Sequence, residues 1–505
     1  MAKPKFIPCQ PKGLDIEALK KERETLSLRK YQENHLGMFI QNERFADLSE
    51  AGVGKTPPAC LYIYWLWKVQ GIKTIFSMPK SLLVKNYEEL LRWSEFEVDD
   101  IVMLRGTPAD RERQINSNAK VFLCAHDTFA NNWEAILSGH PEVKALVSDE
   151  WHLGFSTHGE VFYKRNSQVP LYSGTARTAK MYQFMKKTKA RLLAMTGTLV
   201  KGRLCSAYPL IQLINPLYYG TYDNFMTWHA MLDDYGKPYM WLEHERLAKI
   251  LKRHSCSMTF SDAYGKENKQ VFIELCTMSD KQRKAYSDME ENALLELEDS
   301  FLEGKTPALA VLRCRQIMQC PEMYDLPHGD DGKDAHIEEH IQRAIDEGTP
   351  LVIFETAKMA QNRINQLAIK LGARSVVLNG DTAGPRRGDY DLMMRQGKLD
   401  VLVAAPIVAG VGFNWSNVSH MVFSSIDYGD DTFIQNYRRA LRGKRETPLK
   451  IYILQYRKSI DQRIAAIVNQ KSKDRILVMG DRDTAVHITR NSVDGVIGGK
   501  PDDDD

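Results

Sequence analysis

The chain has 505 residues, of which 43% are hydrophobic and 26% charged, and its formal net charge is +3. A chain of this length and apolar content can bury two or three hydrophobic cores, which excludes a single small domain and makes two large domains the first expectation. The near-neutral charge is compatible with a nucleic-acid partner but does not require one.

The eight cysteines include no C-x-x-C pair, which argues against a zinc site or a disulfide framework and fits a reducing cytoplasm. The first residues contain no apolar signal core, and the longest apolar run, 59–67, is too short to span a bilayer. We therefore expect a soluble cytoplasmic protein.

Short apolar runs, often β-branched and each followed by turn residues and a helical pattern, recur along the first half of the chain. They occupy 45–48, 74–78, 121–124, 145–148 and 192–195. Strands that alternate with helices predict a parallel sheet covered by helices on both faces.

The pattern restarts in the second half, at 351–354, 376–378, 401–404, 421–424 and 451–454. Between 216 and 348 long polar and aromatic helical patterns dominate, with 271–276 as the main strand signal. We predict an α/β fold of two tandem parallel-sheet lobes with a helical insertion near their junction. Lobe 1 would span 22–258, lobe 2 would span 259–480, and 481–505 would be a polar, acidic-ended tail.

A phosphate-binding loop follows the first predicted strand and precedes a helix. It consists of Glu50, Ala51, Gly52, Val53, Gly54, Lys55 and Thr56. In this context backbone N–H groups and the helix N-terminus can hold the phosphates of ATP, Lys55 can contact the β and γ phosphates, and Thr56 can hold Mg²⁺. Ser49 stands where the general pattern has glycine, and the alternative is a chance glycine-rich turn.

A second constellation, Asp149-Glu150-Trp151-His152, directly follows the apolar strand that ends at 148. Its acids are therefore expected at the carboxyl edge of the sheet, where ligands bind in such folds. Asp149 is suited to orient the Mg²⁺ shell, and Glu150 to position and deprotonate the attacking water. The alternative for an isolated acid pair is a solvated strand end, but the phosphate loop upstream favours the catalytic interpretation.

A third group, Gln435, Arg439 and Arg442, lies on a helix predicted over 433–443. The spacings of four and three residues would place all three side chains on one helical face, where two guanidinium groups could reach a phosphate. Two distant parts of the chain would then build one nucleotide site, as in a two-lobed motor. For the nearby Arg438, Lys444 and Arg445 the alternative is a position that only faces solvent.

Taken in order, these motifs resemble the superfamily-two helicases and, within them, the Swi/Snf-type DNA translocases, over about residues 25 to 470. Residues 28–32, with Arg29 and Gln32, are similar to the family's adenine-reading glutamine motif. His152 completes a D-E-x-H box, and 196–198 match its T-G-T coupling motif. Further matching segments are 79–83, 278–282, 312–317 and 410–414, the last of which includes Gly412.

The resemblance implies two RecA-like lobes and an ATPase that uses Mg²⁺ to move on duplex or branched DNA, with RNA a less favoured partner. Replication, recombination or repair is the setting that we expect. Phosphate contacts in such motors come from loop edges after strands. Our candidates are Lys80, Ser81, Thr128 and Thr382, although Ser and Thr at such places also commonly cap helices.

Some positions depart from the family pattern. Trp151 replaces a small residue, and the family's W-N-P and H-R-x-G-Q stretches are replaced at 428–430 and 441–444. The small size favours a phage or bacterial source. The rival interpretations are a strand-separating DNA or RNA helicase, a nucleic-acid-binding scaffold with a degenerate ATPase core and, least favoured, a nuclease.

Overall fold

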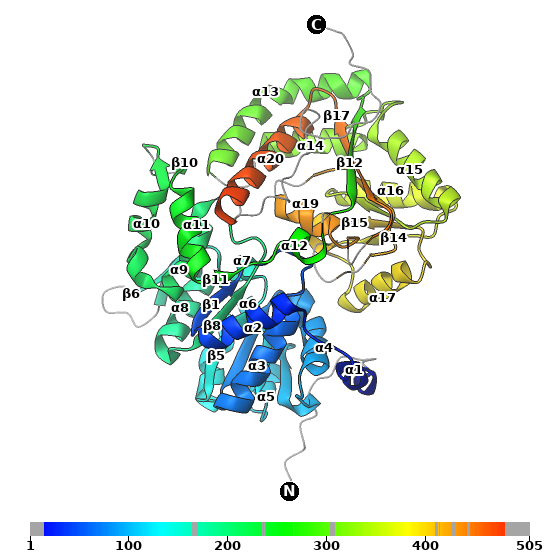
Figure 1. Cartoon of the computed structure of the whole chain (residues 1–505). Helices are drawn as coiled ribbons and strands as arrows, with labels where there is room; N and C mark the ends of the chain where they lie inside the picture. Colours follow the sequence, from blue (N-terminus) through cyan, green and yellow to red (C-terminus); the bar gives the residue numbers. More distant parts are fainter. Residues whose placement is uncertain are drawn as a thin grey trace. The chain divides into compact units, whose positions relative to one another are not determined.

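The described part of the chain forms two compact units, which are considered one at a time. The computed structural model describes residues 15–163, 170–200, 203–234, 236, 238–265, 267–303, 309–409, 413, 415–426, 430–441 and 445–479. The first unit comprises Met1–Met231 and Trp241–Ala263, and the second comprises Leu232–Met240 and Tyr264–Asp505. Figure 1 shows a central sheet with flanking helices in each.

The first unit is built on a parallel sheet whose strands bury nearly every side chain. Its described strands follow the order β11 (Ser255–Cys256), β1 (Arg44–Asp47), β8 (Arg191–Met195), β5 (Val143–Ser148), β2 (Lys73–Met78), β4 (Val121–Ala125) and β3 (Ile101–Leu104). All six residues of the central strand β2 are buried. Burial on both faces explains why these strands are continuous apolar runs without alternation.

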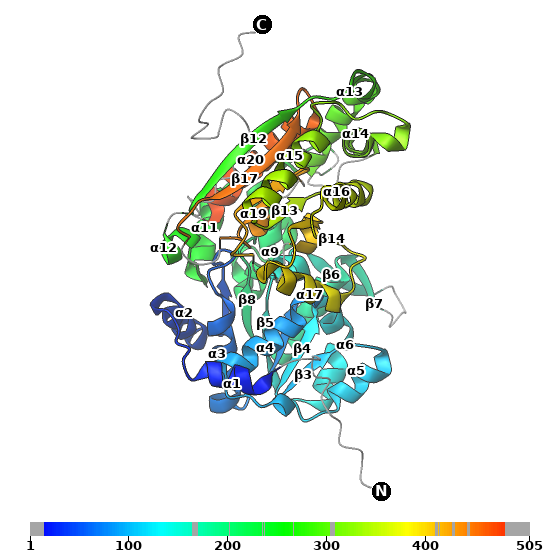
Figure 2. The same cartoon turned by 90° about the vertical axis from the view of Figure 1, so that its right-hand side faces the viewer.

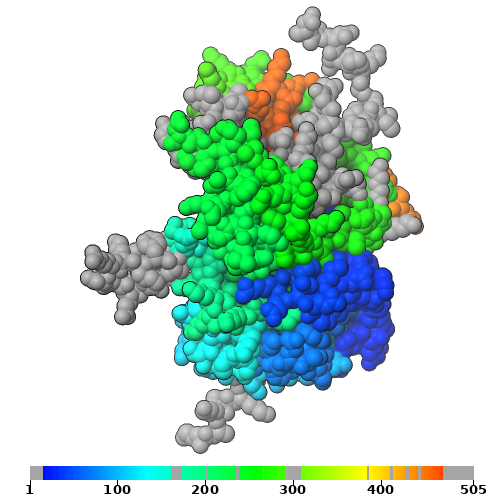
Figure 3. Space-filling view, turned by 60° about the vertical axis from the view of Figure 1, so that its left-hand side comes forward, coloured from blue at the N-terminus to red at the C-terminus, as the bar shows by residue number. Residues whose placement is uncertain are grey.

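Helices cover both faces of this sheet, as right-handed crossovers between parallel strands require. On one face lie α1 (Ile16–Arg23), α2 (Lys30–Gln41), α3 (Thr56–Gln70) and α4 (Leu83–Trp93), and on the other α5 (Pro108–Ile115) and α6 (His126–Gly139) (Figure 2). Helix α8 (Ala176–Thr188) packs against α6. Figure 3 shows that the blue segment that contains α2 forms part of the surface of this unit.

Shorter elements complete the first unit. They are α7 (Trp151–Phe155), α9 (Tyr208–Ile214), α10 (Tyr222–His229), α11 (His244–Arg253), the 3-10 turns η1 (Lys80–Leu82), η2 (Val98–Asp100), η3 (Leu204–Ala207) and η4 (Pro216–Tyr218), and the antiparallel pair β6 (Gly159–Tyr163) and β7 (Pro170–Gly174). The strands β9 (Ala230–Leu232) and β10 (Pro238–Trp241) and the helix α12 (Phe260–Tyr264) extend across the chain boundaries of the two units.

The second unit has its own parallel sheet. Its described strands follow the order β12 (Lys269–Cys276), β17 (Leu449–Tyr456), β16 (His420–Phe423), β13 (Leu351–Phe354), β15 (Val401–Ala404) and β14 (Ser375–Leu378). Its helical elements are α13 (Asp280–Glu303), α14 (Leu309–Gln319), η5 (Pro321–Tyr324), α15 (Lys333–Glu347), α16 (Lys358–Lys370), α17 (Gly384–Arg395), α18 (Pro406–Ala409), α19 (Asp430–Tyr437) and α20 (Ile460–Met479).

The predicted fold class is confirmed, since two separate parallel sheets carry their helices in α/β order. The runs at 351–354 and 401–404 coincide with β13 and β15, and α10 to α15 occupy most of the predicted helical insertion. Among the described strands, β3, β6, β7, β9, β10 and β11 were not predicted, although β3 is an apolar run as long as β13. Among the described residues, no helix has both the length and the apolar character needed to cross a membrane.

A carboxylate–histidine cluster joins the edge of the second sheet to helix α15. The Oε2 atom of Glu274 on β12 lies 3.2 Å from Nδ1 of His336 and 3.1 Å from Nε2 of His340, and Nε2 of His336 lies 3.1 Å from Oδ1 of Asp331. Burial acts to raise the pKa of Glu274, but the hydrogen bonds to His336 and His340 outweigh it and lower the pKa to about 2.

We predict that this cluster contributes acid resistance to the second unit. Because the folded-state pKa of Glu274 lies below its ordinary value of 4.5, its contribution is present above that pH and is lost as the pH falls toward 2. In thermal unfolding of the full chain, the wild type should lose stability as the pH falls from about 4.5 to 2, and Glu274→Gln should lose less over the same range. The exposed Glu338→Gln on the same helix is the control, and an unchanged acid slope in Glu274→Gln would contradict the assignment.

Candidate nucleotide site

The phosphate loop of the first unit connects the end of β1 to the start of α3. Gly52 and Gly54 have φ angles of +90° and +87°, which side chains other than glycine rarely adopt. The Nζ group of Lys55 donates to the backbone carbonyls of Ser49 at 2.8 Å and Glu50 at 2.9 Å. Through these contacts the loop backbone folds around the Lys55 side chain. Thr56 is the first residue of α3.

Helix α2 places the glutamine motif against this loop. The amide nitrogen of Gln32 donates to the carbonyl of Gly54 at 2.8 Å, while its amide oxygen accepts from the backbone N–H of Arg29 at 2.8 Å. The hydroxyl of Tyr31 donates to the carbonyl of Val53. The two motifs, 22 residues apart in the chain, therefore form one surface.

The loop entrance, where serine replaces the usual glycine, is held by two acids. The Oδ1 atom of the fully buried Asp47 accepts from the backbone N–H of Ser49 at 2.9 Å. The Oε2 atom of Glu50 accepts from the backbone N–H of Phe260 at 2.9 Å, and its own N–H donates to the carbonyl of Met258 at 3.0 Å. These contacts fix the backbone on both sides of Ser49, whose buried hydroxyl has no hydrogen-bond partner among the described residues.

The predicted acids lie at the carboxyl edge of β5. The backbone N–H of Asp149 donates to the carbonyl of Ser77 at 2.8 Å, and the side-chain amide of Asn86 donates to Oδ2 of Asp149 at 3.3 Å. Glu150 has a φ of +49°, an uncommon conformation for a residue with a side chain, and its N–H donates to Oδ1 of Asp149 at 3.0 Å. Strained backbone of this kind often marks functional positions.

A buried histidine supports this turn. His126 contacts Ser77 through Nδ1 at 2.6 Å. A β-carbon on Gly154 would lie 2.7 Å from the His126 ring, so the last turn of α7 packs directly on it. Burial lowers the pKa of His126 to about 3, which keeps the imidazole neutral.

His152 connects the acids to the T-G-T segment. Its Nδ1 atom lies 2.7 Å from the hydroxyl of Thr196, 3.1 Å from the hydroxyl of Thr198 and 3.4 Å from Oε2 of Glu150. The glycine between the two threonines packs on the phosphate loop. A β-carbon on Gly197 would lie 3.0 Å from the backbone nitrogen of Ala51.

Trp151, the unusual residue of the D-E-x-H box, is fully buried. Its ring packs against Phe155 with centroids 4.9 Å apart. The large side chain is therefore accommodated in the core behind the acids.

In the second unit the structure corrects the predicted arginine helix. The helix α19 ends at Tyr437, so Gln435 is helical but Arg439 lies in the following turn. The N–H of Arg439 bonds to Asn436 at i−3, and its carbonyl accepts from the N–H of Trp415 at 2.9 Å. The prediction of one helical face was wrong because these backbone contacts tighten the chain into a turn.

The solvent-facing alternative for Arg438 and Arg445 was also wrong. Arg438 is buried, and its Nε donates to Oε1 of Glu267 at 2.8 Å. Lys269 pairs with the same carboxylate and donates to the hydroxyl of Tyr437 at 2.7 Å. Arg445 donates to the backbone carbonyls of Ala440 at 2.7 Å and of 416 and 418. Arg438 therefore ties the residue after α19 to Glu267, and Arg445 fixes the turn that follows.

Several sequence-predicted residues lie outside the described part of the chain. They are Gly412, Arg442 and Lys444, the other motif positions 410, 411, 414, 428, 429 and 443, and the tail from 480 onward.

The four candidate DNA contacts occupy different settings. Lys80 and Ser81 are exposed on η1, directly after β2. Thr128 lies in the first turn of α6, where its carbonyl accepts from the side chain of Asn132 at 2.7 Å. In the second unit the hydroxyl of Thr382 accepts from the N–H of Asn379 at 3.0 Å, so it stabilises its own turn.

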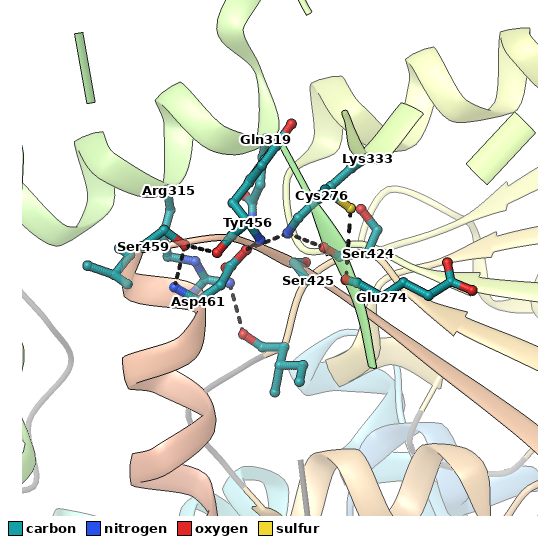
Figure 4. A network of polar contacts seen from close by, with 12 residues as sticks. Glu274, Cys276, Arg315, Gln319, Lys333, Ser424, Ser425, Tyr456, Ser459 and Asp461 are labelled. Carbon is teal, nitrogen blue, oxygen red and sulfur yellow. Dashed lines mark hydrogen bonds and ion pairs between the residues drawn. The ribbon is translucent and has the colours of Figure 1, made fainter. Parts of the chain in front are cut away.

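A polar network spans the carboxyl ends of β13 and β16 in the second unit. The buried Nζ of Lys333 donates to the carbonyl of Ser424 at 2.6 Å and pairs with Asp461 at 2.7 Å (Figure 4). Arg315, which belongs to a segment similar to the family, donates to the hydroxyl of Thr356 at 3.1 Å. The network fixes the loop ends of this sheet to α14, α15 and α20.

Sequence reasoning did not select Asp47, His35 or His126, although each contacts a motif or its supporting strand. The available signals were weak: a charged residue at the end of an apolar strand, and histidines in otherwise amphipathic helices. Spatial neighbours from distant segments are not visible in a single sequence.

No protein-family model matches the chain. The ISWI chromatin-remodeling complex ATPase ISW1 of Saccharomyces cerevisiae is 21% identical over 476 residues, a match that covers 88% of this chain. This similarity agrees with the resemblance to the Swi/Snf-type ATPases that the sequence motifs indicate. It spans only 39% of the length of that curated relative.

Two solved structures are also similar to this chain. The SWI2/SNF2 ATPase core of Sulfolobus solfataricus in complex with dsDNA has a TM-score of 0.38 and 17% identity, with 91% of this chain and 94% of that chain covered. The Hef helicase domain of Pyrococcus furiosus has a TM-score of 0.49 and 14% identity, with 87% and 98% covered.

We predict that Gly197→Ala destabilises the first unit. The new β-carbon would meet backbone atoms at 3.0, 3.2 and 3.3 Å, in Ala51, Ser49 and Glu50, and none of them is the end of a flexible side chain. A cost of about 1–3 kcal/mol is typical of such overpacking, and urea unfolding measures it.

Gly37→Ala is the matched control. No heavy atom lies within 4 Å of a β-carbon there, and the position is inside α2. It should raise stability by about 0.5–1 kcal/mol. Equal effects of the two substitutions would contradict the close packing at Gly197.

Proposed function

We propose that this chain is an ATP-dependent DNA translocase or helicase that couples ATP hydrolysis to movement on duplex or branched DNA. The observation that carries the proposal is the set of direct contacts within the first unit. Gln32 bonds to the phosphate loop, Gly197 packs on it, and His152 joins the T-G-T threonines to the acids. Replication, recombination or repair is the proposed setting.

Mg²⁺ fits the donors that the first unit offers. Thr56 and Asp149 supply a hydroxyl and a carboxylate oxygen, the hard ligands that Mg²⁺ prefers, and the amide of Asn86 orients the carboxylate. When bound, the ion would neutralise charge on the phosphates of ATP. Lys55 would exchange its loop carbonyls for phosphate oxygens, with the backbone N–H groups of 51–54 around them.

The hydrolysis step would rest on Glu150. Its carboxylate would orient the attacking water and accept its proton, because phosphoanhydride hydrolysis needs a positioned nucleophile and charge stabilisation. His152 would link the position of the Glu150 carboxylate to the hydroxyl groups of Thr196 and Thr198. Gln435, Arg439 and Arg442 are the proposed contributors from the second unit, and Gly412 is a proposed neighbour of the nucleotide.

The DNA partner is proposed to contact loop edges after strands, at Lys80, Ser81, Thr128 and Thr382. The decisive experiment measures the ATPase rate of the full chain with single-stranded DNA, duplex DNA, forked DNA and RNA. Stimulation by duplex or forked DNA above the other polymers supports a translocase. A rate that is indifferent to every polynucleotide contradicts the proposal.

We predict opposite binding outcomes for two inactive variants. Glu150→Gln should lower turnover by about a hundredfold or more, since it removes a general base, and should still bind ATP. Lys55→Ala should bind ATP poorly, because its charge acts on the phosphates already in the ground state. Nucleotide binding and steady-state turnover, measured side by side, check both statements.

Two exposed residues of the same unit serve as controls for these variants, Lys68→Ala on α3 and Glu134→Gln on α6. Both should keep wild-type turnover. Wild-type turnover in Glu150→Gln would contradict the assignment of Glu150 as the general base.

We predict that DNA binding weakens steeply with salt. Phosphate contacts release counterions, so the logarithm of affinity should fall linearly with the logarithm of salt concentration, by about 0.9 per duplex phosphate neutralised. Lys80→Ala should reduce that slope by about 1, whereas Lys68→Ala should leave it unchanged. A wild-type DNA affinity that does not change with salt concentration would exclude a motor that binds DNA through its phosphates.

A further inference from the structure

Three side chains with metal-ligand chemistry converge in the first unit, beside the strand that enters the phosphate loop. His35 comes from α2, Asp47 from the end of β1 and Cys256 from β11. One ligand atom of each lies within 4.8 Å of the others. All three residues are buried, with exposed fractions of 6%, 0% and 6%.

The carboxylate of Asp47 has one satisfied oxygen and one that lacks a hydrogen-bond partner among the described residues. Its Oδ1 atom accepts from the N–H of Ser49, whereas Oδ2 is buried and has no hydrogen bond. Nδ1 of His35 lies 3.6 Å from Oδ2. That distance is too long for a hydrogen bond, and a buried acceptor without a donor is costly.

The same distance suits two ligands of one ion. Zinc binds imidazole nitrogen and carboxylate oxygen at about 2.0–2.2 Å in tetrahedral geometry, which places neighbouring ligand atoms roughly 3.3–3.6 Å apart. The third donor is the Cys256 sulfur, which makes a weak contact of 3.8 Å with the carbonyl of Ala46. Small changes in the side-chain torsions would bring the nitrogen, oxygen and sulfur atoms within bonding distance of one ion.

The charges of the three ligands balance those of a divalent cation. Burial, with the nearby Asp47 adding to it, raises the pKa of the Cys256 thiol. A metal ion would displace the thiol proton, and one thiolate plus one carboxylate would cancel its double charge while the imidazole stays neutral. A buried ion of this kind needs such compensation.

We propose that His35, Asp47 and Cys256 form a binding site for a divalent ion of the zinc class. The nitrogen, oxygen and sulfur donors suit a borderline-soft ion rather than Mg²⁺, which prefers oxygen ligands. The ion would fasten α2, β1 and β11 together. Because α2 carries Gln32 and β1 leads into the phosphate loop, the site would fix the adenine-reading helix relative to that loop.

The full-length chain, purified in reductant and stripped with a chelator, is titrated with Co²⁺ as a spectroscopic substitute for Zn²⁺. We expect one Co²⁺ per chain, with the near-ultraviolet charge-transfer band of a cobalt–thiolate bond, and displacement of the band by Zn²⁺. Mg²⁺ sites made of oxygen ligands cannot produce this band. The absence of the band in the wild type overturns the proposal without any substitution.

Matched variants identify the ligands. Cys256→Ala should abolish the band, whereas Cys124→Ala, which removes another buried cysteine of the same unit, should keep it. Asp47→Asn preserves the shape of the side chain and should weaken Co²⁺ binding at least tenfold. A band that survives Cys256→Ala, or an unchanged affinity in Asp47→Asn, overturns the site.

Thermal unfolding provides an independent readout. Excess Zn²⁺ should raise the unfolding midpoint of the wild type, because an ion that binds only the folded state stabilises it by mass action. The shift should disappear in Cys256→Ala and persist in Cys124→Ala. Equal shifts in wild type and Cys256→Ala overturn the proposal. None of these measurements involves ATP or DNA, so they are independent of the proposed motor function.

Discussion

The backbone of the phosphate loop must stay in a conformation that only its neighbours can hold. Gly52 and Gly54 occupy positive φ angles, and the loop's carbonyls turn inward to the Lys55 ammonium group. A free loop would lose this arrangement, because backbone ordering costs conformational entropy. Gln32 and Gly197 close on the loop from two sides, so its shape is a property of the whole first unit.

Asp149 and Glu150 are likewise held in place by contacts with neighbouring parts of the first unit. The positive φ of Glu150 persists because the adjacent Asp149 is tied to β2 and because His126 fills the space against Gly154. His152 then carries the arrangement to the T-G-T segment. The acid turn and the phosphate loop are therefore joined through the packed T-G-T segment.

In the second unit, buried charges set the geometry of the segment that bears the arginines. Glu267 is held by Arg438 and Lys269, and its pKa is lowered because these partners outweigh the effect of burial. Helix α19 ends at Tyr437 beside these charges, and Arg439 lies in the following turn. Removing one member of such a buried set leaves an uncompensated charge, which is more damaging than losing an exposed pair.

The sequence by itself determined the elements whose chemistry is local. Apolar runs between turn residues predicted β13 and β15, the glycine spacing predicted the loop at 50–56, and an acid pair after a strand predicted the edge position of Asp149. The tertiary structure alone decided that Arg438 is buried, that α19 is short and that Asp47 faces His35 and Cys256. These outcomes depend on contacts between residues far apart in the chain. Such contacts leave no periodic pattern in a single sequence.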